Sequence, residues 1–130
     1  MLLEEKLRDD EDIDEKDFKR LYIGQFYDGK PQGEGVMYHP GGTKVKYQGY
    51  LFNGLYSDIG ELRNLRDEAE FRGSFLLGKK HGFGVEYWQN GFIKFAGDFK
   101  DDKRSGTGSE FDKFGFKIRN GIWEAGEFIG

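Results

Sequence analysis

The sequence contains no cysteine, only two prolines and no long apolar run. The lack of cysteine excludes disulfide bonds and favours a reducing, cytoplasmic location. No apolar stretch approaches the ~18 residues of a transmembrane helix, and the acidic residues that follow Leu2 and Leu3 are unlike a signal peptide. Hydrophobic residues make up only 36% of the chain. These shortages predict a soluble protein with much exposed surface.

Glycine and aromatic residues are abundant instead, and they recur at a fixed interval. Five glycines follow one another at spacings of 25, 24, 24 and 24 residues: Gly24, Gly49, Gly73, Gly97 and Gly121. Two residues before them stand four aromatic residues and one arginine: Tyr22, Tyr47, Phe71, Phe95 and Arg119. A repeat of this length indicates an array of stacked supersecondary units, and it favours binding over catalysis.

Each unit is expected to be a β-hairpin. Side chains alternate between the two faces of a strand, so Tyr22, Gly24 and Phe26 share one face and Gly24 leaves a slot between two rings. We expect a ring from the neighbouring hairpin to cover this slot. Gly29 through Gly33 then supplies a turn, and residues 35–38 return as the second strand. A lone hairpin is marginally stable, so the units must stack.

The glycine and aromatic pattern resembles a known family. The pattern Tyr-x-Gly-x-Phe-x-x-Gly-x-x-x-Gly-x-Gly is intact over 22–35 and recurs with Phe for Tyr over 71–84. It is similar to the MORN (membrane occupation and recognition nexus) repeat, with units starting at 22, 47, 71, 95 and 119 within 22–130. The resemblance implies an all-β solenoid of stacked antiparallel hairpins. Repeat two departs most, with Asp58 and Arg63 in place of a glycine and an aromatic residue.

Residues 1–21 differ from the repeats. They hold nine acidic and five basic residues and no glycine, so they carry the net charge of −4 while the array 22–130 is neutral. We interpret 1–21 as an acidic leader, either a short amphipathic helix that caps the first hairpin or a disordered, solvated tail.

No pattern in the chain indicates an active site, a metal site or a cofactor site. Asp10, Asp12 and Asp14 have the spacing of a calcium loop, but Glu15 and Leu21 stand where that loop needs glycine and glutamate. The only two histidines lie at different repeat positions, and the glycine pairs follow the repeat without the ending of a phosphate loop. We therefore expect a protein that is no enzyme, has no cofactor and binds no nucleic acid.

Three surfaces are candidates for partner binding. Rings at equivalent positions would form an aromatic groove: Tyr22, Phe26, Tyr47, Phe71, Phe75, Tyr87, Phe95 and Phe99. The last strand would leave an open edge with apolar residues on both faces: Ile122, Trp123, Phe128 and Ile129. Basic residues at the hairpin tips would form a ridge that contacts anions or lipids: Lys30, Lys79, Lys80, Lys103 and Arg104.

The favoured function is a scaffold or interaction module that binds another polypeptide through the groove or the open edge. A helix or strand in the groove, or a second copy at the C-terminal end, would be the occupant. The resemblance implies roles in cytoskeletal, ciliary or membrane-associated assemblies. Two alternatives stay open: a peripheral membrane adaptor that binds anionic phospholipids, and a regulatory fragment of a larger enzyme.

Overall fold

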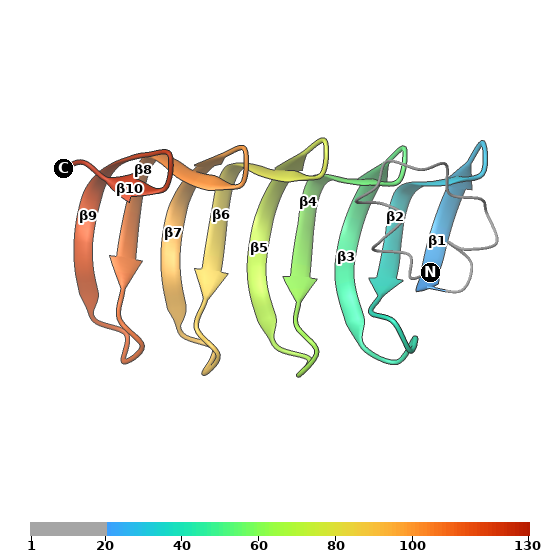
Figure 1. Cartoon of the computed structure of the whole chain (residues 1–130), viewed down its shortest axis with the longest axis horizontal. Coiled ribbons are helices and arrows are strands. Elements are labelled where there is room, and N and C mark those ends of the chain that lie inside the picture. Colours follow the sequence, from blue (N-terminus) through green and yellow to red (C-terminus); the bar gives the residue numbers. More distant parts are fainter. Residues whose placement is uncertain (1–20) are drawn as a thin grey trace.

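The chain forms one open antiparallel sheet in which each strand pairs with the next along the sequence (Figure 1). The computed structural model describes residues 21–130. The ten strands are β1 (Tyr22–Tyr27), β2 (Lys30–Tyr38), β3 (Val45–Phe52), β4 (Leu55–Arg63), β5 (Ala69–Leu76), β6 (Lys79–Tyr87), β7 (Ile93–Lys100), β8 (Lys103–Phe111), β9 (Lys117–Glu124) and β10 (Glu127–Phe128). The predicted all-β stack of antiparallel hairpins is confirmed. The acidic leader predicted over 1–21, a short helix or a disordered tail, lies outside the described residues except for Leu21.

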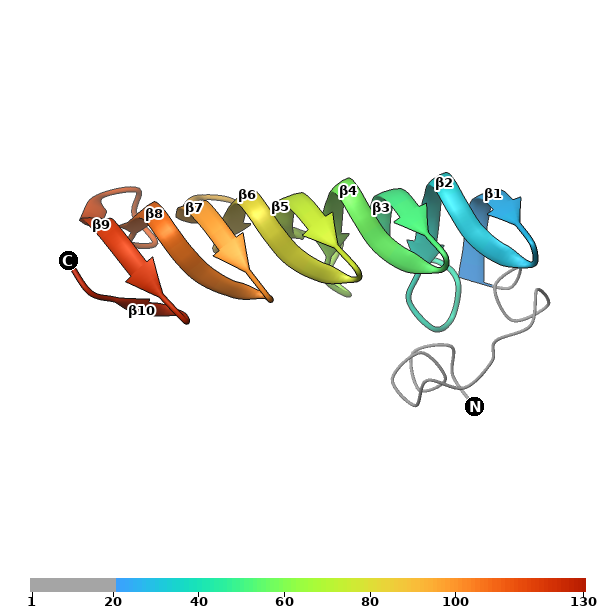
Figure 2. The same ribbon diagram turned by 90° about the horizontal axis from the view of Figure 1, so that it is seen from above.

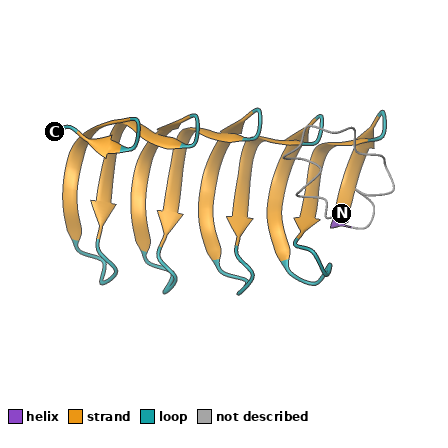
Figure 3. Cartoon of the chain, in the orientation of Figure 1, coloured by secondary structure: helices purple, strands orange, loops and turns teal. Residues whose placement is uncertain are grey.

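The strands lie side by side along the long axis of the molecule, and the connections alternate between two edges (Figures 1 and 2). Tight turns follow β1, β3, β5, β7 and β9 along one edge, which we call the tip edge. Longer loops follow β2, β4, β6 and β8 along the other, the loop edge (Figure 3). Among residues 21–130, no helix is long and apolar enough to cross a membrane.

The tight turns have the geometry that joins twisted antiparallel strands. In each of them both central residues have positive φ, for example 52° and 78° at Asp28 and Gly29 and 50° and 84° at Leu77 and Gly78. This is the signature of a type I′ turn, which Asp-Gly and Asn-Gly favour. The second strand therefore starts at Lys30 and not at Gly35 as predicted. Gly33, with a φ of 99°, accommodates a bulge inside β2 and not the turn.

A row of paired glycines crosses nine strands of the sheet. Each glycine lies opposite the next: Gly24, Gly35, Gly49, Gly60, Gly73, Gly84, Gly97, Gly108 and Gly121. The predicted slot exists, but the ring that covers it comes from the same hairpin. A Cβ on Gly84 would lie 2.3 Å from Cζ of Phe71, and one on Gly60 would lie 2.1 Å from the hydroxyl oxygen of Tyr47. The glycines therefore let each hairpin close over its own ring.

The core is a single layer of aromatic side chains on one face of the sheet. Seven rings contact one another in succession, edge to face, at centroid distances of 5.1 to 5.6 Å: Tyr47, Phe75, Phe71, Phe99, Phe95, Trp123 and Phe128. Such pairs contribute about 0.5–1.5 kcal/mol beyond the burial of their area. Leu51 replaces a ring in repeat two, so the pair formed by Tyr22 and Phe26 stands apart from this series.

Candidate functional site

The rings predicted to line a groove form the core of the sheet. Six of the eight are buried, with at most 4% of their surface exposed: Tyr22, Tyr47, Phe71, Phe75, Phe95 and Phe99. Phe26 packs against this core and is partly buried. Tyr87 lies on the other face of the sheet, where the guanidinium of Arg72 lies 5.6 Å from its ring centroid. A partner-binding role for these rings stays a prediction, because in this structure they contact one another.

Two of the five predicted ridge cations lie over the aromatic core. Lys80 pairs with Phe75 across β5 and β6, so its side chain shares the face of the rings, and its Nζ lies 4.7 Å from the centroid of Phe71. Arg104 occupies the same place one repeat later, 4.4 Å from the centroid of Phe95 and 5.0 Å from that of Trp123. Cation–π contacts of this kind are attractive. Neither cation belongs to a ridge at the tips.

Arg104 also bridges two carboxylates. Its Nε donates to Glu86 and its Nη1 to Glu110, each at 2.9 Å, and all three side chains are largely buried. Glu110 in turn pairs with Arg119 at 3.1 Å. Glu86 and Glu110 occupy the position that Met37 and Leu62 hold in the first two repeats. The core face therefore changes from apolar side chains at this position to charged ones in β6 and β8, and Arg119 continues the charged residues in β9.

The rest of the predicted ridge is sparse. Lys30, Lys79 and Lys103 each follow a tip turn directly, whereas Leu55 takes this place in repeat two. Lys79 and Lys103 are exposed and Lys30 is half-buried. Three lysines separated by a leucine make a weaker anion site than the five cations expected from the sequence.

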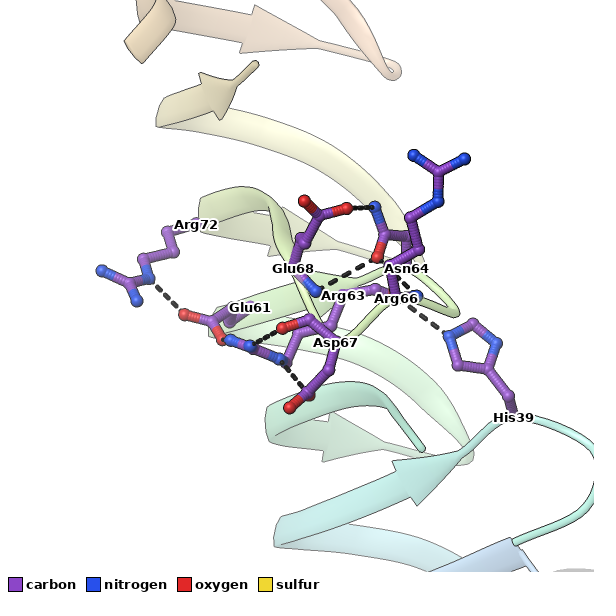
Figure 4. A network of polar contacts seen from close by, with 8 residues as sticks. All are labelled: His39, Glu61, Arg63, Asn64, Arg66, Asp67, Glu68 and Arg72. Atoms are coloured by element: carbon purple, nitrogen blue, oxygen red, sulfur yellow. Dashed lines mark hydrogen bonds and ion pairs between the residues drawn. The ribbon is translucent and has the colours of Figure 1, made fainter. Parts of the chain in front are cut away.

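A polar network that the sequence did not predict joins β4 and β5 on the face opposite the core (Figure 4). Glu61 accepts hydrogen bonds from Arg63 and Arg72, and Arg63 also pairs with Asp67 at 3.1 Å. Burial alone would raise the pKa of Glu61, but the two arginines together lower it below its ordinary value of 4.5. Asp67 lies in the irregular loop between β4 and β5, so its ion pair with Arg63 stabilises that loop.

The loop edge of repeats three and four carries exposed aromatic side chains. Phe114 and Phe116 are 69% and 71% exposed, and Phe92 in the preceding loop is 49% exposed. Neighbouring loops are hydrogen-bonded to each other, since Asn90 Nδ2 donates to the carbonyl of Lys113 at 2.7 Å, and Trp88 Nε1 donates to the carbonyl of Phe111 at the end of β8 at 3.1 Å. Phe92 and Phe116 are 24 residues apart and occupy the same position of their loops. In the first two repeats this loop position is held by Thr43 and Glu68. Comparison of the four loops would have revealed this patch.

The predicted open edge exists only in part. Ala125 and Gly126 form a type I′ turn, and the short β10 then pairs with Trp123 and Glu124 of β9. The Ile129 N–H also donates to the carbonyl of Ile122 at 2.8 Å. The remainder of this edge is formed by residues 117–121 of β9, on the side away from β8. Among residues 21–130 no strand pairs with it, and we call it the free edge. Trp123 and Phe128 belong to the core, whereas Ile122 and Ile129 are 43% and 59% exposed.

Neither histidine belongs to a metal-binding group among the described residues. The Nε2 of His39 lies 2.9 Å from the carbonyl oxygen of Arg63 and so links the loop after β2 to the end of β4 (Figure 4). His81 is half-buried in β6. Within 21–130, no group of three histidine, cysteine, aspartate or glutamate side chains is placed to hold a metal ion.

The repeat pattern is shared with known proteins. The family model for the MORN repeat matches residues 22–44, 71–92 and 95–111. Alsin of Rattus norvegicus is 40% identical over 91 residues, and alsin of Mus musculus and of Homo sapiens are 37% and 36% identical over the same length. These matches cover 67% of this chain but only 5% of each alsin. The matched repeats coincide with the observed hairpins, and the chain belongs to the MORN-repeat family.

Proposed function

We propose that this chain is a non-enzymatic interaction module that binds another polypeptide at the C-terminal end of its hairpin stack. The observation that carries the proposal is the free edge of β9, flanked by the exposed side chains of Ile122 and Ile129. An unpaired strand edge offers backbone donors and acceptors in a row, and a neighbouring chain can pair with them. A repeat family that serves in interaction supports this choice over catalysis.

A cytoskeletal, ciliary or membrane-associated assembly is the setting we propose for this partner. The relatives named above are far longer than this chain, which spans 5% of their length. A regulatory segment of a larger protein is therefore compatible with the same interaction role.

The experiment that tests the proposal is affinity capture with matched variants. Ile122→Lys with Ile129→Lys places two charges beside the free edge, whereas Ile23→Lys with Ile59→Lys makes the same change at two other exposed isoleucines. We expect the wild type and the control to enrich the same partner and the edge variant to lose it. Equal capture by all three chains, or no enrichment by the wild type, would contradict the proposal.

Binding to anionic phospholipids is the second candidate, and the exposed Lys79 and Lys103 at the tip edge favour it. Cations near a charged membrane contribute about 1 kcal/mol each, so this sparse group predicts weak binding. Sedimentation with anionic vesicles tests it. Tight, salt-sensitive binding that Lys79→Glu with Lys103→Glu abolishes would rank the lipid role first.

A further inference from the structure

We propose that the free edge of β9 binds one extended segment of another polypeptide, which pairs antiparallel and sets a carboxylate opposite Arg119. This inference rests on the proposed interaction function and names the chemistry of the partner. It follows from the neighbours of Phe95, the residue that stands at the position of Arg119 in the preceding repeat.

Phe95 in β7 stands one repeat before Arg119 and has a neighbouring strand on each side. It lies between two strands that each place a glutamate directly opposite it, Glu86 on β6 and Glu110 on β8. The cation Arg104 bridges these two carboxylates at 2.9 Å each. A glutamate that is paired with Arg104 therefore lies on each side of Phe95 on the core face.

Arg119 in β9 has a glutamate opposite it on one side only. Glu110 on β8 lies opposite it and pairs with its guanidinium at 3.1 Å. On the other side no strand of residues 21–130 pairs with Arg119. Its guanidinium lies 5.4 Å from the ring centroid of Phe128, and 46% of the side chain is exposed. A second carboxylate on that side would complete the arrangement, and a hydrogen-bonded ion pair to arginine is among the stronger polar contacts.

The backbone of β9 is oriented to accept such a segment. The carbonyl of Ile122 accepts the Ile129 N–H, so the backbone groups of Ile122 point away from β8. Because these groups alternate in direction along a strand, those of Asn120 point to the same side. The Asn120 N–H and C=O are therefore the next pair available to a partner strand.

Charge argues for a different polypeptide over a second copy of β9. A two-fold axis at Ile118 would set Lys117 against Arg119 of the copy and Arg119 against its Lys117. Like charges directly opposite each other destabilise a strand pair. An acidic segment avoids this repulsion and gains attraction from both cations.

The test uses a peptide that imitates the strand next to β9. The probe is a fluorescein-labelled peptide with the sequence of residues 106–113, which contains the glutamate that faces Arg119 from β8. Fluorescence anisotropy is measured at a fixed low concentration of the peptide while the whole chain is added up to about 1 mM. We expect saturable binding that weakens as salt is raised, because the ion pair is partly exposed.

Three protein variants locate the binding. Arg119→Glu should weaken binding by about tenfold or more, and a peptide with lysine in place of its glutamate should restore it. Asn120→Pro should also weaken binding, because it removes an N–H on the free edge. It keeps the backbone hydrogen bonds between β9 and β8 but loses the one that the Ser109 hydroxyl donates to the Asn120 side chain. Lys100→Glu, the same charge change on exposed β7, should bind as the wild type does. Thermal unfolding of each variant checks that the sheet persists.

Several results would overturn the inference. No binding by the wild type, equal binding by Arg119→Glu, or no rescue by the charge-reversed peptide would each exclude it. A dimer of the chain in light scattering that Asn120→Pro abolishes would replace it with self-pairing. If affinity capture identifies a partner that Arg119→Glu still binds, this inference fails while the proposed interaction function stands.

Discussion

The ring of Phe71 lies directly over the backbone of Gly84, and a Cβ on Gly84 would come within 2.3 Å of its Cζ. The same relationship joins Phe95 to Gly108 and Tyr47 to Gly60. Each hairpin is thus closed by a ring that uses the space of a missing side chain.

This relationship predicts that Gly84→Ala lowers the free energy of unfolding by roughly 1–3 kcal/mol, because the new methyl group displaces a packed ring. Phe71→Leu removes the ring edge, so the double variant should lose less than the sum of the two single changes. Urea unfolding of the four chains measures this coupling. Strict additivity would show that Phe71 and Gly84 do not compete for the same space.

Arg104 should be more important for stability than an exposed cation. Arg104→Met is expected to cost roughly 1–3 kcal/mol, since it leaves the largely buried Glu86 without its cation and Glu110 with Arg119 alone. Changing the two glutamates to leucine in the same chain should recover most of this loss, because Leu62 already occupies this position in repeat two. If Arg104→Met unfolds at the same urea concentration as the wild type, the bridge does not stabilise the stack.

The tip turn at Leu77 offers a stabilising change. Leu77 has a φ of 50°, a conformation that costs an ordinary side chain about 1–2 kcal/mol and that asparagine adopts more easily. Leu77→Asn should therefore raise the free energy of unfolding by several tenths of a kcal/mol to about 1 kcal/mol, creating an Asn-Gly turn. Leu76→Asn, at an exposed strand position next to it, is the control and should not stabilise.

The network around Glu61 predicts a pH dependence. Its folded pKa is lowered, so its contribution to stability is present above its unfolded value near 4.5 and is lost as the pH falls through the folded value. The wild type should exceed Glu61→Gln in unfolding free energy at pH 7, and the difference should shrink steadily below pH 4.5. A difference that is constant from neutral to acid pH would mean that Glu61 titrates alike in both states.

The sequence predicted the hairpins and their stacking because both depend on local, repeated features. Glycine at the turn and bulge positions and rings two residues before Gly24 and Gly73 recur with the period of the fold. The face that each side chain occupies was harder to predict. Tyr87 directly follows Glu86, which lies opposite Phe71 and Phe95, so the alternation of side chains along β6 places Tyr87 on the other face.

The cations show the same limit. Lys80 and Arg104 follow the tip turns in sequence, so they were expected at the tips, yet pairing with Phe75 and Phe99 brings them over the rings. The covering of Trp123 by β10 was also missed, because two residues after a turn give no periodic signal. Contacts between repeats depend on register, and a period alone does not determine it.

Amide hydrogen exchange at Asn120 tests the proposed docking edge most directly. In the free chain the Asn120 amide should exchange rapidly, while those of Arg119 and Gly121, which point toward β8, should be protected. Addition of the captured partner or of the peptide with the sequence of residues 106–113 should slow exchange at Asn120 and leave the tip turns unchanged. Binding that leaves Asn120 exchanging rapidly and protects another face of the sheet would contradict a docking site at this edge.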